Sequence, residues 1–163
     1  MIDISRLSKQ FDVRKLGDSD VDIILELCRE NTQYYQYCGA ETSKEQILED
    51  LHSIPPGIGK YYIGFFRKSI LIAVMDLIDG YPEPDVAYVG FFMMKKEEQG
   101  RQIGSTIIQE TAAYLKETGK TAIQLGIDQE NPQSTYFWKK NGFHVIREVD
   151  LDGWTALVAE KKL

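Results

Sequence analysis

The stretch Glu97-Glu98-Gln99-Gly100-Arg101-Gln102-Ile103-Gly104-Ser105 lies between an apolar run that is typical of a strand and an amphipathic run that is typical of a helix. A glycine-bearing turn that leads into a helix leaves backbone N–H groups unpaired, and the aligned peptide dipoles add partial positive charge there. The stretch therefore predicts an anion-binding turn that suits a phosphate or pyrophosphate. It has neither the Gly-Lys-Ser/Thr ending of a P-loop nor the third glycine of a dinucleotide-binding turn, which disfavours a nucleotide hydrolase.

A second informative segment is Asn131-Pro132-Gln133-Ser134-Thr135-Tyr136-Phe137-Trp138-Lys139-Lys140-Asn141-Gly142-Phe143. Asn131 suits the cap of a helix, Pro132 suits its first turn, and Gly142 can take the left-handed conformation that ends it. The pattern predicts a short helix. The spacing from Gly104 to Asn131 is 27 residues, which leaves room for one helix and one strand between the two segments.

Together the two segments resemble the motifs of the GNAT superfamily of acetyl-CoA-dependent N-acyltransferases. The pyrophosphate motif of that family reads Gln or Arg, two residues, Gly, one residue, Gly or Ala, and Gln99 and Gly104 fit it. Gln102 stands where the family usually has glycine, so its side chain must point away from the phosphates or weaken their binding. The residues that match the family's downstream helix are Asn131, Ser134, Phe137, Gly142 and Phe143.

The rest of the chain predicts strands and helices in the order of the GNAT fold. Strands are expected over residues 11–16, 61–66, 70–78, 87–94, 122–127, 144–149 and 155–160, and helices over 20–30, after Thr42, over 103–119 and after Asn131. The resemblance implies an α/β GNAT-like acyl-CoA N-acyltransferase fold, with a central mixed, mostly antiparallel sheet flanked by helices. We expect residues 1–163 to form a single GNAT-like acetyltransferase domain.

Two helix starts carry capping signals. Ser19 and Asp22 resemble a capping pair for the first helix, and Thr42 and Glu45 have the spacing of a capping box for the second. The second helix is expected to end at Pro55-Pro56-Gly57, because proline cannot continue a helix.

Composition limits the classes of partner. A formal charge of −6 and a pI near 5.0 disfavour nucleic acid and favour a cationic or amine-bearing partner. The amino terminus lacks a signal peptide, and no apolar run is long enough to span a bilayer, so we expect a cytoplasmic protein without a membrane partner. Cys28 and Cys38 are too few for a zinc framework, so no metal is expected and both are interpreted as reduced thiols.

The resemblance implies acetyl-CoA, and hence coenzyme A, as the acyl donor. Backbone N–H groups from Gly100 to Ser105 would hold the pyrophosphate. Arg101 would add a charge-assisted contact or would be a solvated surface charge, and the sequence leaves both readings open. The residues that the resemblance assigns to the cofactor are Phe92, Met93, Met94, Gln99, Gly100, Arg101, Gln102, Ile103, Gly104, Ser105, Asn131, Ser134, Phe137 and Trp138.

The implied chemistry is acyl transfer from a thioester to an amine. The N–H of Met94 is the candidate donor to the acetyl carbonyl. Trp138 stands where the family often has a tyrosine that protonates the departing thiolate, and Tyr136 is turned about 200° away on the helix, which makes it a weak substitute. A base must also deprotonate the amine. The candidates for this base are Asp76, Asp85, Tyr88, Asp128 and Glu130, and we retain Asp128.

The acceptor pocket of this family usually lies between the first two helices, where this chain has Tyr34, Tyr35 and Tyr37. Three tyrosines in four residues predict a lined cavity for a small-molecule or peptide amine, although such aromatics also anchor irregular loops to a core. Dimers are frequent in the family, so a homodimer is compatible with the resemblance. Gln102, Trp138 and the absence of a carboxylate in residues 87–94 leave an alternative, a noncatalytic acyl-CoA-binding or sensing module on the same scaffold.

Overall fold

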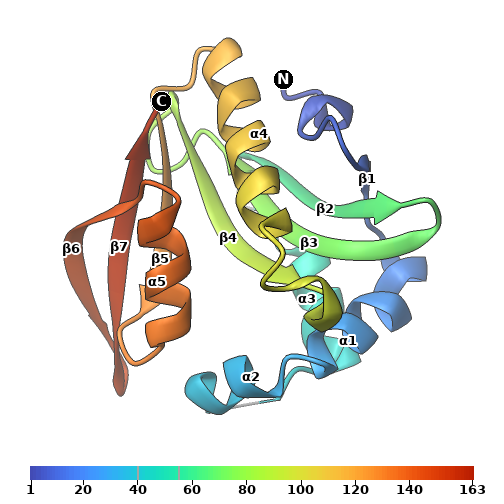
Figure 1. Ribbon diagram of the computed structural model, residues 1–163. Coiled ribbons are helices and arrows are strands. Elements are labelled where there is room, and N and C mark those ends of the chain that lie inside the picture. Colours follow the sequence, from blue (N-terminus) through green and yellow to red (C-terminus); the bar gives the residue numbers. More distant parts are fainter. Residues whose placement is uncertain (40, 55) are drawn as a thin grey trace.

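A seven-stranded sheet organises the chain in a computed structural model that describes residues 1–39, 41–54 and 56–163 (Figure 1). The strand order is β1-β2-β3-β4-β5-β7-β6, and β4 and β5 form the parallel pair of an otherwise antiparallel sheet. The strands are β1 Asp12–Lys15, β2 Gly59–Arg67, β3 Ile70–Asp79, β4 Val86–Met94, β5 Ala122–Asp128, β6 His144–Leu151 and β7 Trp154–Lys162. The predicted fold class is confirmed.

Helices cover both faces of this sheet. Figure 1 shows α4 and α5 on one face, with α1 and α3 behind the other. The helices are α1 Val21–Arg29, α2 Thr32–Cys38, α3 Lys44–His52, α4 Ile103–Glu117 and α5 Pro132–Lys140, and short 3-10 turns cover Ile4–Arg6, Asp18–Asp20 and Lys96–Glu98. No helix in these described ranges has both the length and the apolar character that a membrane crossing requires.

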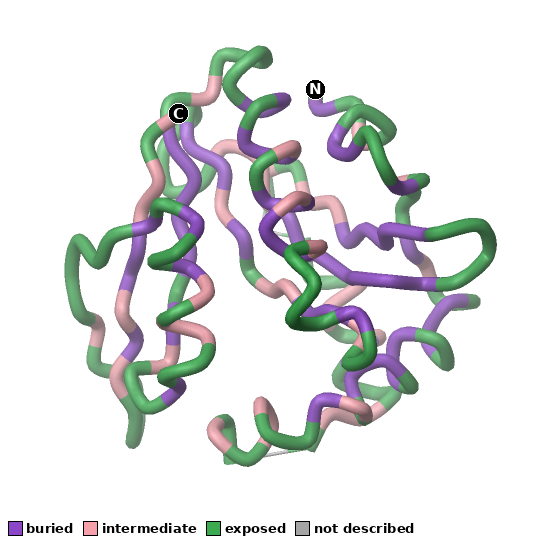
Figure 2. Tube along the Cα trace, in the orientation of Figure 1, coloured by how far each residue is buried: buried purple, intermediate pink, exposed green. Residues whose placement is uncertain are grey.

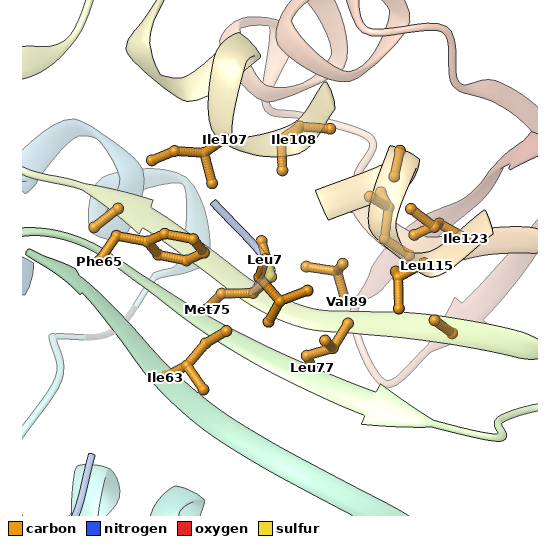
Figure 3. Close-up of a cluster of buried hydrophobic side chains, with 14 of the residues drawn as sticks. Leu7, Ile63, Phe65, Met75, Leu77, Val89, Ile107, Ile108, Leu115 and Ile123 are labelled. Atoms are coloured by element: carbon orange, nitrogen blue, oxygen red, sulfur yellow. The ribbon is translucent and has the colours of Figure 1, made fainter. Parts of the chain in front are cut away.

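The larger core lies between the sheet and α4. Ile107, Ile108 and Leu115 of α4 are at most 2% exposed, and they pack against apolar side chains of β2, β3, β4 and β5 (Figure 3). Figure 2 shows that burial follows β3 and the inner side of α4, whereas the edge strand β6 is mostly exposed. The apolar residues whose spacing predicted α4 therefore form the face of this helix that is buried against the sheet.

The opposite face carries a second core. Ile24, Leu25 and Cys28 of α1 pack with Ile47 of α3 over β2, β3 and Met93 of β4. Cys28 is buried in this core, where it packs as a small apolar side chain, and both cysteines are free thiols, as interpreted from the sequence.

The details at two helix starts differ from the prediction. The Asp20 carboxylate accepts from the Gly17 N–H at 2.9 Å and from Arg14, so α1 follows a 3-10 turn and has no Ser19–Asp22 capping pair. At α3 the cap is Ser43, whose Oγ accepts from the Gln46 N–H at 3.1 Å, one residue later than the Thr42–Glu45 prediction.

The segment between α1 and α3 also differs from the prediction. Residues 32–38, for which no helix was predicted, form α2. Its C-cap, Gly39, has a left-handed φ of 73°. Pro55, which was predicted to help end α3, lies outside the described residues. The boundary errors arise because adjacent Ser, Thr and Asp residues cap helices about equally well, so tertiary contacts choose among them.

Candidate functional site

The parallel strands β4 and β5 separate halfway along their length. They pair from Val86–Ala122 to Val89–Leu125, and beyond that point residues 90–94 of β4 have no partner on β5 (Figure 1). The other edge of β5 pairs with β7 along its whole length. We call this separation the fork. The register of β3 against β4 also shifts here, so that Gly90 is an extra residue without an opposite partner, a β-bulge.

Backbone groups of β4 point into the fork. The Lys95 N–H donates to the Ile72 carbonyl at 2.8 Å, which makes this pair a hydrogen-bonded one. Because hydrogen-bonded and non-hydrogen-bonded pairs alternate in an antiparallel ladder, Met94 and Phe92 turn their N–H and C=O groups away from β3. The N–H groups of Phe92 and Met94 therefore face the side on which β5 has diverged.

A row of free N–H groups begins α4. In the part of the chain that the structure describes, the N–H groups from Gly100 to Ser105 have no hydrogen-bond acceptor, and the first helical bond is Thr106 N–H to Gln102 O at 3.0 Å. Gly100 and Gln102 both have left-handed φ values, 76° and 63°, which curl the chain into a turn. Such a row at a helix start has the geometry and partial positive charge that suit an anion, as the sequence predicts for this turn.

Gln102 keeps the backbone conformation of a glycine at a cost. A non-glycine residue in this region is strained by about 1–2 kcal/mol, because its Cβ crowds the following carbonyl. We expect Gln102→Gly to raise the free energy of unfolding by about 1 kcal/mol, measured by urea denaturation. Lys68→Gly in the β2–β3 turn, where φ is 56°, is the matched control and should give a similar gain. A gain at Lys68 without one at Gln102 would contradict this explanation.

Two contacts fasten the turn to the sheet. Glu98, 6% exposed, accepts from both terminal nitrogens of Arg67, at 2.7 and 3.3 Å. These bonds hold the pKa of the Glu98 carboxyl below its ordinary value. The turn is thereby tied to the β2–β3 hairpin and is held in place from outside the cavity.

Three chain segments meet at the Met94 carbonyl. It accepts from Asn31 Nδ2 at 3.0 Å and from Gln99 Nε2 at 3.1 Å, and Gln99 Nε2 also donates to Asn31 Oδ1 at 2.6 Å. Asn31 lies at the α1–α2 junction, and Gln99 lies in the turn that leads into α4. This network fixes the end of β4 against both segments.

The start of α4 packs closely against aromatic rings of α5. A Cβ added at Gly104 would stand 2.6 Å from Met94 Sδ and 3.2 Å from the Phe137 ring. Phe137 stacks on Phe92 with ring centroids 6.0 Å apart, and Trp138 contacts Phe92 at 5.9 Å and Phe143 at 5.1 Å, both edge-on. Trp138 is 7% exposed and fills the core as well as reaching the cavity.

The start of α5 has the expected cap. The Asn131 side chain accepts from the Ser134 N–H at 3.0 Å, Pro132 lies in the first turn, and Gly142 has φ 88°. At its other end Asn141 Nδ2 donates to Ser105 Oγ at 3.2 Å, which joins the end of α5 to the start of α4.

These parts enclose a cavity of about 390 Å³ at the fork. The predicted site residues on its wall are Tyr34, Phe92, Met93, Met94, Gln99, Gly100, Gln102, Gly104, Ser105, Asn131, Ser134, Tyr136, Phe137 and Trp138. The cavity thus brings together the α1–α2 region, β4, the turn before α4 and α5, and both sequence motifs lie on its wall. The roles of these residues remain predictions.

Other predicted residues lie off this wall. Arg101, Ile103, Tyr35, Tyr37 and Asp128 are not among the residues that line the cavity. Arg101 is exposed, which is compatible with the second of its two predicted roles, a solvated surface charge. The Asp128 carboxylate accepts from the Glu130 N–H at 2.9 Å and so closes a turn at the end of β5. Tyr136 does reach the cavity, but it is 70% exposed, as its turn on the helix predicts.

Some lining residues were missed by the sequence reasoning. Glu30, Lys96, Gln133 and Lys140 also border the cavity. Lys96 and Lys140 are exposed and can add positive charge near the row of free N–H groups. Neither belongs to a motif, and only the folded arrangement places them together. The cavity can therefore hold an elongated ligand with an anionic end and an apolar arm.

Comparison with known proteins gives related sequences and structures. The sequence model of the Acetyltransferase (GNAT) family matches residues 24–143. The chain is 25% identical to the spermidine N(1)-acetyltransferase of Thermoplasma acidophilum over 163 residues, which cover 93% of this chain and 96% of that protein.

Two solved structures are similar over almost the whole chain. An acetyltransferase from Thermus thermophilus has a TM-score of 0.77 at 21% identity and covers 94% of this chain and 97% of its own. The PaiA N-acetyltransferase from Thermoplasma acidophilum, in complex with coenzyme A, has a TM-score of 0.69 at 25% identity. The match covers 94% of this chain and 99% of that protein.

Proposed function

This chain belongs to the Acetyltransferase (GNAT) family and is an N-acetyltransferase enzyme, and from that premise we propose that it transfers the acetyl group of acetyl-CoA directly to an amine in a ternary complex. The observation that carries the proposal is the cavity at the fork. Among the described residues, Gly100 to Ser105 have free N–H groups, and four of these six residues, Gly100, Gln102, Gly104 and Ser105, stand on its wall. The end of β4 that has no partner on β5 forms another part of the wall.

The fit to coenzyme A rests on charge and shape. The free N–H groups at the start of α4 suit a pyrophosphate, and Lys96 and Lys140 supply positive charge nearby. The N–H groups of Phe92 and Met94 that face the fork suit the amide-bearing pantetheine arm, because an exposed strand edge pairs readily with an extended chain. We therefore assign the cofactor to this cavity.

The reaction needs a donor to the thioester carbonyl. Both Phe92 and Met94 turn their N–H groups into the fork, so either can stabilise the negative charge that develops on that oxygen. The thioester supplies an activated acyl carbon, whose leaving group is a thiol with pKa near 8.5. Such a thiol can depart as the thiolate at neutral pH, which suits a site whose helix offers Trp138 where a tyrosine acid would stand.

We propose a small amine as the acceptor. Tyr34 of α2 packs edge-on against Phe91 of β4, with ring centroids 6.1 Å apart, and lines the cavity on the face covered by α1. Burial raises the pKa of the Tyr34 hydroxyl, so it remains a neutral hydrogen-bonding group at neutral pH. Aromatic rings and a negative overall charge favour an alkylammonium ligand, and one relative is named a spermidine N(1)-acetyltransferase.

The experiment combines binding with turnover. Calorimetric titration with acetyl-CoA, with ATP as the control, should give saturable binding near one site per chain. Release of coenzyme A, followed with a thiol reagent, should then depend on an added amine such as spermidine. Saturable binding without release across a broad panel of amines would instead support a noncatalytic sensor, and no acetyl-CoA binding to the folded protein would overturn both.

A further inference from the structure

A buried carboxylate lies beside the fork. Asp76 of β3 is opposite Tyr62 of β2 and Phe91 of β4 in the sheet, so the three side chains lie on one face. This is the face covered by α1 and α3, on which Tyr34 packs against Phe91. Asp76 is 8% exposed, and its Oδ1 is buried without a hydrogen-bond partner among the described residues. A buried polar atom without a partner is costly and requires an explanation.

The β-bulge places Gly90, the first residue beyond the β4–β5 pairing, directly beside this carboxylate, although neither residue is among those that line the cavity. Gly90 is exposed, and a Cβ placed there would stand 3.0 Å from Asp76 Oδ2, with all three of its nearest heavy atoms belonging to Asp76. Any side chain at residue 90 would therefore cover the carboxylate. Two residues further along β4, a rise of about 7 Å, lies Phe92, whose N–H faces the fork.

One cation faces the carboxylate from the other side. Lys60 Nζ lies 3.3 Å from Asp76 Oδ2 and donates to the Asp50 carbonyl of α3 at 2.7 Å. The other titratable groups near Asp76 are the Asp50 carboxylate of α3 and the Tyr62 hydroxyl of β2, and Tyr88 lies on the same face of β4 before the bulge. Lys60 therefore contacts Oδ2, the same oxygen that lies beside Gly90, and Oδ1 is the oxygen without a partner among the described residues.

We propose that Asp76 binds the protonated amine of the acceptor at the Gly90 bulge and takes up its proton. This inference rests on the proposed function and names the carboxylate that the acetyl transfer needs. An alkylammonium ion that approaches over Gly90 reaches Oδ2 beside the backbone N–H groups of β4. The bulge, the missing side chain and the incompletely bonded carboxylate together form a site for a primary amine.

Asp76 takes one of the two protons that the amine nitrogen loses. The –NH₃⁺ group gives this proton to the Asp76 carboxylate, which becomes a neutral acid, and the freed lone pair forms a bond to the thioester carbonyl carbon. The C–S bond breaks and its electron pair leaves with sulfur. The second proton of the nitrogen goes to that thiolate, and the Asp76 proton is returned to solvent. Burial raises the pKa of Asp76, which suits a group that must hold a proton, while Lys60 lowers it.

The other carboxylate candidates are engaged elsewhere. Asp85 is exposed, precedes β4 at the end away from the fork, and accepts from Thr121 Oγ1 at 2.7 Å. Asp128 closes its turn with Glu130, and the Glu130 side chain is exposed. Tyr88 has its pKa raised by burial, so it is a poor base at neutral pH.

The first test compares Asp76→Asn with wild type. We expect kcat/KM for the amine to fall by about 10²- to 10⁴-fold, the range for loss of a positioned base. The acid limb of the pH profile that belongs to Asp76 should disappear, while the calorimetric Kd for acetyl-CoA stays unchanged. Asp79→Asn is the matched control, because Asp79 also lies on β3 and pairs with a lysine, Lys120, but at the far end of the strand. It should keep wild-type kcat/KM.

Two further variants test the geometry with Asp76 in place. Gly90→Ala should raise KM for the amine without changing the Kd for acetyl-CoA, since its methyl covers Oδ2 and its φ is not left-handed. Lys60→Met should move the acid limb to higher pH, because Lys60 lowers the pKa of Asp76. Both variants keep the test decisive if Asp76→Asn does not fold.

The outcomes separate the two proposals. An active wild type with an unchanged kcat/KM and an unchanged acid limb in Asp76→Asn would overturn the role of Asp76 and leave acetyl transfer standing. A folded wild type that binds acetyl-CoA but releases no coenzyme A with any amine would overturn acetyl transfer itself. A third outcome is that Asp76→Asn loses thermal stability and acetyl-CoA binding while the acid limb of its pH profile stays unchanged. That result would assign Asp76 a structural role.

Discussion

Gly104→Val is expected to abolish measurable acetyl-CoA binding while the protein remains folded. The new side chain would collide with Met94 Sδ and the Phe137 ring, which lie 2.6 and 3.2 Å from the position of its Cβ. Both neighbours stand on the cavity wall, and Gly104 itself belongs to the row of free N–H groups. We expect the Kd to rise at least about 100-fold, equivalent to about 2.7 kcal/mol, measured by calorimetry.

Gly17→Val is the matched control for this change. A Cβ at Gly17 meets nothing within 4 Å, and the φ of −139° is open to any residue, so acetyl-CoA binding should stay at the wild-type level. Overpacking at Gly104 costs about 1–3 kcal/mol of stability, so circular dichroism should show a folded protein with a lowered Tm. An unchanged Kd in folded Gly104→Val would remove this cavity as the coenzyme A site.

Trp138→Ala is expected to lower the free energy of unfolding by about 3–5 kcal/mol, the usual range for truncating a buried large aromatic residue. The indole is 7% exposed and contacts Phe92, Phe137 and Phe143, so its removal leaves a void where α5 packs on the sheet. Urea denaturation gives the measurement. The melting temperature should fall by roughly 2–4 °C for each kcal/mol lost.

The second tryptophan supplies the control. Trp154 begins β7 and is 47% exposed, so Trp154→Ala should change stability far less. Trp138→Phe should lose less than Trp138→Ala, because a ring remains to fill part of the void. Equal losses at Trp138 and Trp154 would contradict the view that Trp138 is a packing residue.

The local sequence predicted the strands and helices well wherever its signals were strong. Runs of aromatic and β-branched residues predicted β2, β3 and β4, and Asn131, Pro132 and Gly142 predicted α5. Weak or competing signals failed. Ser43 rather than Thr42 caps α3, and Asp20 is drawn to Arg14 and Gly17, which displaces the expected cap of α1. The helix over residues 32–38 was missed because seven residues are too few to show a clear helical period.

The family motifs, the order of the elements and the turn at Gly100–Ser105 could be predicted from the sequence, because these features depend on the local preferences of a few neighbouring residues. The cavity that these motifs enclose depends on contacts between residues that are far apart in the sequence. The fork, the meeting of Asn31 and Gln99 on the Met94 carbonyl, and the position of Asp76 beside Gly90 each join residues from distant strands and loops. Strand register sets these contacts, and a shift by one residue would turn each side chain to the other face of the sheet.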